Sequence, residues 1–171
     1  MTTVVRAEEA ADRAAVEAVH RAAFPSAAEA RLVNALRTGG RAVVSLVAET
    51  DDEVVGHILF SPVSVEPARP GVAGAGLAPV AVPPSRQCQG IGSQLVIQGV
   101  AACRRAGFDF IVVLGHPAYY RRFGFAPASG FGLVNEYGVD REFMVLELSA
   151  GCLRGMHGTV RYSDEFSSLA A

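Results

Sequence analysis

A polar turn with two glycines follows an apolar segment and leads directly into a helical pattern, and its residue types suit a phosphate ligand. The turn spans residues 87–93, with Gly90 and Gly92 inside it. Glycine has no Cβ, so its backbone can adopt left-handed dihedrals and approach a ligand closely. The first amides of the following helix have no helical acceptor, and they lie at the positive end of its dipole. These features predict a site for a pyrophosphate.

The spacing of the glycines argues against two common phosphate-binding motifs. A G-x-G-x-x-G dinucleotide motif needs a third glycine or alanine, and Leu95 occupies that position. A nucleotide P-loop needs Gly-Lys-Ser/Thr, and no lysine follows the turn. An ATP- or NAD-binding enzyme is therefore kept only as a disfavoured alternative.

Two segments match motifs of a known family. Gln87, Gly90 and Gly92 fit a Q/R-x-x-G-x-G/A signature. Downstream, Tyr120 and the pair Gly124-Phe125 fit a Y-x-x-x-G-F pattern at the end of a strand and a short helix. With these segments the chain resembles the GNAT superfamily of N-acetyltransferases, and in particular a bacterial branch that is largely unassigned.

The resemblance implies an α/β (mixed α+β) GNAT-like fold. Its central mixed sheet is mostly antiparallel, contains a splayed parallel pair and is flanked by helices. It also implies that acetyl-CoA is the acetyl donor. Backbone groups of Val80, Ala81 and Val82 are expected to bind the pantetheine amides, because Pro79 leaves this strand partly unpaired. The turn is expected to bind the pyrophosphate through Gln87, Cys88, Gln89, Gly90, Ile91, Gly92 and Ser93.

The implied reaction is direct attack of a primary amine on the thioester in a ternary complex. The departing thiolate needs a proton, and a phenol of pKa ~10 is nearly matched to a thiol of pKa ~8.5 to 10. The resemblance assigns this acid to Tyr120, with Tyr119 as the alternative. Backbone N–H groups near Val80 would polarise the thioester carbonyl.

The sequence does not single out one general base or one acceptor. The strand before the turn, residues 76–82, has no carboxylate. A water chain or an amine that arrives deprotonated would serve equally well. The acceptor is an amine of a small molecule, a peptide or a protein terminus. The candidate bases elsewhere in the chain are Glu29, His57, Glu66 and His116.

Two other functions compete with this one. A non-catalytic module that senses acyl-CoA would share the cofactor site but would be free to lose Tyr120. An acyl-cysteine mechanism at Cys88 is disfavoured, because no His and acid follow at a triad spacing and Cys88 would meet the pyrophosphate end of the cofactor.

The elements that would position these residues follow from apolar periodicity, glycines and prolines. The strand, glycine turn, helix and strand around the turn predict a right-handed βαβ unit with a parallel pair. Ser26 is the expected N-cap of the second helix, and the long strand is expected to break near Ser61-Pro62. Predicted strands cover 4–7, 42–49, 54–66, 76–82, 108–114 and 142–148, with a last edge strand at 159–162 and a fraying end at 167–171; predicted helices cover 8–23, 26–38, 90–105 and 117–123.

Composition narrows the class of protein. With 171 residues, half of them hydrophobic, we expect one domain over 1–171. A net charge of −2 without basic runs predicts no nucleic-acid or anionic-membrane partner. Three scattered cysteines and no signal or membrane-spanning pattern predict a reduced, cytoplasmic protein without a metal. The sequence does not distinguish a monomer from a homodimer. All fifteen basic residues other than histidine are arginine.

Overall fold

The computed structural model describes residues 2–170, which form two compact units. The first unit contains the chain up to Phe60, residues 78–102 and the chain from Asp164 onward. The second contains residues 61–77 and 103–163. Strands β3 (Glu53–Glu66) and β4 (Gly74–Ala81) and helix α3 (Ile91–Arg105) contribute residues to both units.

The first unit is built on an antiparallel hairpin. Strand β2 (Val44–Thr50) pairs with β1 (Thr3–Ala7) on one side and with the first part of β3 on the other. Asp51 and Asp52 form the connecting turn at φ of 51° and 62°. Two successive left-handed residues are what a tight two-residue hairpin requires.

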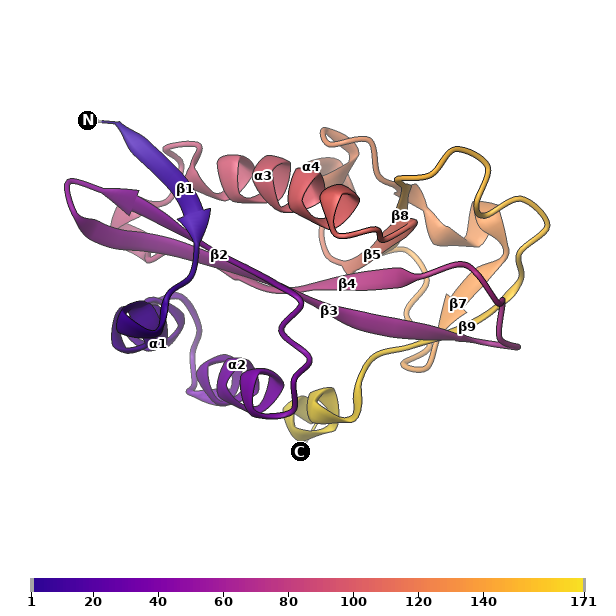
Figure 1. Ribbon diagram of the computed structural model, residues 1–171, viewed down its shortest axis with the longest axis horizontal. Coiled ribbons are helices and arrows are strands. Elements are labelled where there is room, and N and C mark those ends of the chain that lie inside the picture. Colours follow the sequence, from indigo (N-terminus) through magenta and orange to yellow (C-terminus); the bar gives the residue numbers. More distant parts are fainter. Residues whose placement is uncertain (1, 171) are drawn as a thin grey trace. The chain divides into compact units, whose positions relative to one another are not determined.

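Helices cover both faces of this hairpin. In Figure 1, α1 (Arg13–Ala23) and α2 (Ala28–Thr38) lie on one side of β2 and β3, and α3 lies on the other. The short 3₁₀ helix η1 (Ala10–Asp12) leads into α1, and the C-terminal η4 (Asp164–Ala170) contacts α2. The helices bury apolar side chains against the sheet, among them Val16, Val19, Leu32, Leu36 and Leu95.

The second unit contains the parallel pair. Strand β5 (Phe110–Leu114) runs parallel to β4, with Gly74 to Gly76 opposite Phe110 to Val112. Its other side pairs antiparallel with β8 (Phe143–Glu147), which also pairs with β6 (Ala126–Pro127). The remaining short helices are η2 (Pro84–Arg86) in the first unit, and α4 (Pro117–Arg121) and η3 (Ala128–Phe131) in the second.

A second layer of pairing in this unit corrects one prediction. Strand β9 (Gly158–Arg161) bonds antiparallel to the end of β3 and parallel to β7 (Leu133–Asn135). It therefore has a partner on each side, whereas the sequence predicted an edge strand.

The predicted class, a mostly antiparallel sheet with a parallel pair and flanking helices, is confirmed, with corrections at several boundaries. Strand β3 runs through Ser61-Pro62 without the predicted break. The predicted first helix is divided into η1 and α1, since the Glu9 amide donates to the Asp12 carboxylate at 2.7 Å. Helix α2 begins at Ala28, and Ser26 Oγ accepts the Ala28 amide at 3.2 Å without being the N-cap. The predicted fraying end falls partly in η4, and its last residue lies outside the described residues.

Candidate functional site

The glycine turn between β4 and α3 is exposed over residues 87–90 and leads into the first turn of a long helix. Cys88 and Gly90 adopt left-handed conformations, at φ of 62° and 81°. The amide of Gln94 donates to Gly90 O at 3.0 Å and is the first helical bond. Helix geometry therefore gives the amides of Ile91 and Gly92 no acceptor four residues earlier. Such amides can bind an anion at the positive end of the dipole.

Side chains brace the turn from within the same unit. Gln87 Nε2 donates to Val82 O at 2.9 Å, which ties the turn to the end of β4. Arg86 pairs with Glu53 at 3.0 Å. Residues 83–93 contain no carboxylate, so no side chain of the turn itself repels an anion.

A glycine that the sequence analysis did not single out lets α3 start close to the sheet. A Cβ on Gly56 of β3 would lie 3.0 Å from Leu95 Cδ1, 3.1 Å from Ile91 Cγ2 and 3.3 Å from Ala81 O. These approaches are at or below the tightest ordinary contacts, so a larger residue would displace the helix start or β4. Gly56 thus helps to set the position of the turn.

The end of β4 lies beyond its described pairing with β5. That register covers Gly74 to Gly76, in the second unit, while Val80 and Ala81 belong to the first. Ala81 is buried, and Val80 and Val82 are half-buried. The pairing described between β4 and β5 thus ends before the residues predicted to bind pantetheine.

Tyr120 lies on α4 in the second unit, in a tight aromatic environment. Its ring packs at 5.6 Å from Phe125 and 5.1 Å from Tyr119, measured between centroids. A Cβ on Gly115 would lie 2.4 Å from Tyr120 Cε2, so only glycine leaves room for the ring there. Gly124, at φ of 93°, turns the chain so that Phe125 can return to Tyr120. The Y-x-x-x-G-F pattern thus fixes the tyrosine ring.

Burial raises the pKa of Tyr120 to about 12, with a smaller contribution from Tyr119. The phenol consequently keeps its proton throughout the neutral range, which a general acid requires. The same shift makes proton transfer to a thiolate less favourable than the near balance expected for an ordinary phenol. Tyr120 is therefore better suited to donating a hydrogen bond to a developing negative charge than to complete early proton transfer.

The candidate bases lie in different environments. His57 is fully buried, and both of its ring nitrogens have hydrogen-bond partners, so it cannot contact an amine directly. Glu66 pairs with Arg161 at 2.8 Å, and His116 is exposed beside α4. Glu29, in the first turn of α2, is half-buried, and its Oε2 is shielded from solvent without a hydrogen-bond partner among the described residues. An unpartnered carboxylate oxygen is a natural site for a cation or an N–H donor.

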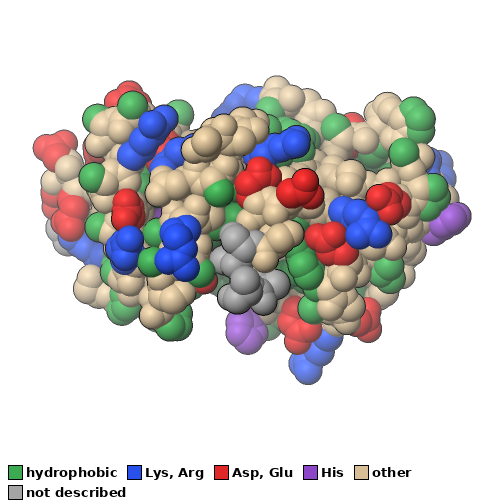
Figure 2. Space-filling view, turned by 90° about the horizontal axis from the view of Figure 1, so that it is seen from below, with side chains coloured by type: hydrophobic (Ala, Val, Ile, Leu, Met, Phe, Trp, Pro, Cys, Tyr) green, Lys and Arg blue, Asp and Glu red, His purple; other side chains and the backbone are tan. Residues whose placement is uncertain are grey.

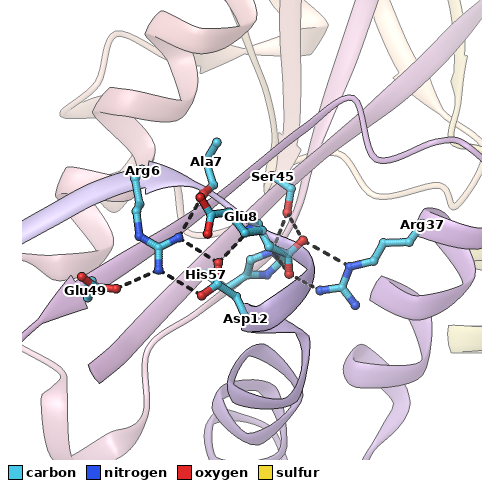
Figure 3. A network of polar contacts seen from close by, with 9 residues as sticks. Arg6, Ala7, Glu8, Asp12, Arg37, Ser45, Glu49 and His57 are labelled. Atoms are coloured by element: carbon cyan, nitrogen blue, oxygen red, sulfur yellow. Dashed lines mark hydrogen bonds and ion pairs between the residues drawn. The ribbon is translucent and has the colours of Figure 1, made fainter. Parts of the chain in front are cut away.

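The sequence analysis missed a polar network under the N-terminal helices of the first unit (Figure 3). Arg6 binds both oxygens of Asp12, at 2.8 and 2.9 Å, and Glu49 at 2.7 Å. Beside it, Arg37 binds the Glu8 carboxylate, which also accepts the Ser45 hydroxyl at 2.9 Å. The available signal is the presence of polar residues, among them Arg6, Ser45 and His57, inside apolar strands.

The surface and the remaining side-chain clusters offer few further candidates. On the face shown in Figure 2, basic and acidic side chains are interspersed. Within residues 2–170, no group of three or more His, Cys, Asp or Glu is arranged to hold a metal ion. No helix in the described part of the chain has the length and apolar character needed to cross a membrane.

Comparisons with known proteins converge on one family. The model of the acetyltransferase (GNAT) family matches residues 8–125. The uncharacterized N-acetyltransferase YhbS of Escherichia coli strain K12 is 38% identical over 167 residues, which cover 96% of this chain and 98% of that protein. The uncharacterized N-acetyltransferase YjhQ of the same strain is 36% identical over 121 residues, or 70% of this chain and 67% of that protein.

Solved structures of the same family are also similar to this chain. The crystal structure of the E. coli GNAT family N-acetyltransferase YhbS in complex with CoA superposes with a TM-score of 0.91 at 35% identity, covering 96% of this chain and 92% of that one. A GNAT family acetyltransferase from Brucella melitensis in complex with acetyl-CoA superposes with a TM-score of 0.79 at 36% identity, covering 96% and 98%.

Proposed function

Because the chain belongs to the GNAT family of N-acetyltransferases, we propose that it moves the acetyl group of acetyl-CoA to a primary amine by direct attack in a ternary complex. The observation that carries this proposal is the turn from Gln87 to Ser93 at the start of α3, whose residues 87–90 are exposed. Related structures that contain CoA and acetyl-CoA support it. Since YhbS matches 96% of the chain, we also propose that residues 1–171 act as a single acetyltransferase domain.

Two segments of the first unit would hold the donor. The pyrophosphate would bind to residues 87–93, where helix amides and left-handed backbone support an anion site. Backbone groups of Val80, Ala81 and Val82 would bind the pantetheine amides as an added strand would. An N–H near Val80 would also polarise the thioester carbonyl, a role typically worth ~2.7 to 4 kcal/mol per donor.

Tyr120 would stabilise the departing thiolate by donating a hydrogen bond from its phenol. Its raised pKa ensures that the hydrogen is present at neutral pH. Tyr119 shares the helix and remains the alternative. Neighbouring helical residues point about 100° apart, so the two phenols present their hydroxyls in different directions.

Glu29 is the most suitable of the candidate residues to receive the acceptor amine. Its unpartnered oxygen would bind the ammonium form and take up its proton, directly or through water. Glu29 would thus accept the proton that the attacking amine releases. The acceptor class stays a small molecule, a peptide or a protein terminus, and the oligomeric state a monomer or a homodimer.

Thiol release from acetyl-CoA over a panel of primary amines tests the proposal. We expect wild-type turnover on at least one amine, a loss of about 10²- to 10⁴-fold in kcat for Tyr120→Phe, and a small effect for Tyr119→Phe. CoA affinity, measured by calorimetry, should be unchanged in both variants. Full turnover in Tyr120→Phe would remove Tyr120 from the mechanism.

The same assay separates the enzyme from an acyl-CoA sensor. A sensor would bind acetyl-CoA tightly and release no thiol with any amine. Glu29→Gln, which keeps the shape of the side chain, should lower kcat/KM for the amine without weakening CoA binding. An unchanged kcat/KM would leave the proton to water or to an amine that arrives neutral.

A further inference from the structure

A continuous chain of hydrogen bonds runs through the first unit from a carboxylate to two buried imidazoles. Ser45 Oγ bonds to Glu8 Oε1 at 2.9 Å, His57 Nε2 lies 2.8 Å from Ser45 Oγ, and His20 Nε2 lies 2.8 Å from His57 Nδ1. We call Glu8, Ser45, His57 and His20 the histidine chain. It joins the segment after β1, strands β2 and β3, and helix α1, and Arg37 of α2 binds its carboxylate end. Figure 3 shows the part of the chain from Glu8 to His57.

The donors and acceptors fix where each proton lies. The Ser45 hydroxyl donates its one hydrogen to Glu8, so Ser45 Oγ must accept from His57 Nε2–H. A neutral His57 then offers only a lone pair at Nδ1, which must accept from His20 Nε2–H. His20 Nδ1 is left as an unprotonated nitrogen, buried and without a partner among the described residues. Every bond of the chain points toward Glu8.

We propose that the histidine chain is a pH-sensitive latch, which holds α1 and α2 on β2 and β3 while both imidazoles are neutral and releases them when the pair takes up a proton. This role is independent of acetyl transfer. It requires that neither imidazole can take up a proton without leaving a buried N–H unsatisfied, and the geometry meets this requirement.

An added proton on either imidazole breaks the pattern. On His20 Nδ1 it creates a buried N–H without an acceptor among the described residues. On His57 Nδ1 it faces the Nε2–H of His20, and turning His20 to its other tautomer moves the unsatisfied N–H back to His20 Nδ1. Either arrangement also buries a charged imidazolium, because neither His20 nor His57 has any exposed surface.

The surrounding charges do not rescue an imidazolium. The charged groups that face the pair are Arg37, from α2, and Glu8, whose Oε2 lies 4.0 Å from His57 Nε2. Glu8 favours a charged imidazole, but its carboxylate is already paired with Arg37. Phe24 stacks on His20 and contributes no charge.

The pKa values have the direction that a latch needs. Burial, and then Arg37, lowers the pKa of His20 to about 4. Burial, and then His20 and Arg37, lowers the pKa of His57 well below its usual value. The folded state therefore binds fewer protons than the unfolded state below pH ~6.5, so the contribution to stability is complete above that pH and is lost as the pH falls.

Urea unfolding followed by circular dichroism at pH 7.5 and pH 5.0 tests the latch. Each histidine should raise the wild-type unfolding constant by up to about 30-fold between pH 7.5 and 5.0. The double variant His20→Phe/His57→Phe removes both partners and should lose most of this pH dependence. His116→Gln/His157→Gln, which changes the two exposed histidines, should keep it. A double Phe variant with the wild-type pH dependence would overturn the latch.

Two measurements on the wild type keep the proposal testable if the double variant does not fold. Long-range ¹H–¹⁵N spectra at pH 7 should show both histidines as Nε2–H tautomers, and an Nδ1–H form or an ordinary titration near pH 6.5 would contradict the chain. Hydrogen exchange at pH 5.0, corrected for intrinsic rates, should show α1 and α2 losing protection before β2 and β3. Equal protection of helices and strands would contradict the release.

Discussion

His20 Nε2 lies 2.8 Å from His57 Nδ1, and this bond between two fully buried imidazoles joins α1 to β3. It holds only while the next bonds hold, because Ser45 accepts from His57 and donates to Glu8. The stability of the first unit should therefore be sensitive to substitution of Ser45, although this residue is only half-buried.

Replacing Ser45 with alanine should destabilise the protein by about 1–3 kcal/mol, because His57 Nε2–H loses its acceptor inside the core. Ser45→Thr keeps the hydroxyl and suits a strand, so it should retain most of the stability. Urea midpoints at pH 7.5 give the comparison. Equal midpoints for the Ala and Thr variants would show that the hydroxyl is unimportant.

Acid should act on a second site at lower pH. Hydrogen bonds from Arg6 lower the pKa of Asp12 to about 2, so its stabilisation is complete above pH ~4 and is lost as the pH falls toward 2. Because the Arg6 side chain is 31% exposed, solvent screens the pair, and we expect roughly 1–2 kcal/mol.

Asp12→Asn should flatten the stability curve between pH 4 and 2. Asp52→Asn, in the exposed hairpin turn where asparagine is well tolerated, should not. Urea unfolding at pH 7, 4 and 2.5 separates the two variants. Similar curves for both would assign the acid loss to other groups.

The turn can be tested with two glycines matched for backbone strain. Gly90 and Gly107 have φ of 81° and 92°, and a Cβ on either would meet nothing within 4 Å. Alanine should cost each about 1–2 kcal/mol of stability from the left-handed backbone alone. Only Gly90→Ala should also weaken CoA binding, by roughly tenfold or more, since its Cβ would project into the anion site. Calorimetric Kd values that change equally would argue against the turn as the pyrophosphate site.

The absence of lysine predicts a simple modification pattern. The chain has no side-chain amine, so incubation with acetyl-CoA should add at most one acetyl group, at the N-terminus. Intact-mass spectrometry before and after incubation measures this directly. Several added acetyl groups would reveal transfer to hydroxyls or thiols.

Local signals predicted the part of the fold that surrounds the turn. Apolar strands, Gly90 and the helical period of residues 91–105 specify a βαβ unit within a short stretch of chain, and β4, α3 and β5 are found there. The turn and its left-handed glycine follow from the same stretch. Sequence was sufficient here because neighbouring residues determine the geometry.

The missed features depend on residues far apart in the chain. Whether 159–162 lies at an edge depends on β3 and β7 together. Gly56 and Gly115 matter because Leu95 and Tyr120 approach them, which no local period reveals. His57 was interpreted as a candidate base, whereas its partners, His20 and Ser45, come from other elements and occupy both of its nitrogens.

The three cysteines differ in exposure, so the turn can be labelled selectively with a fluorescent dye. Cys88 is exposed, while Cys103 is fully buried, with its pKa raised to about 12 by desolvation, and Cys152 donates to Asp109 O at 3.2 Å. A maleimide dye should therefore attach first at Cys88, in a chain without competing lysines. The fluorophore would sit in the turn itself, so its emission could be used to screen ligands without knowledge of the acceptor.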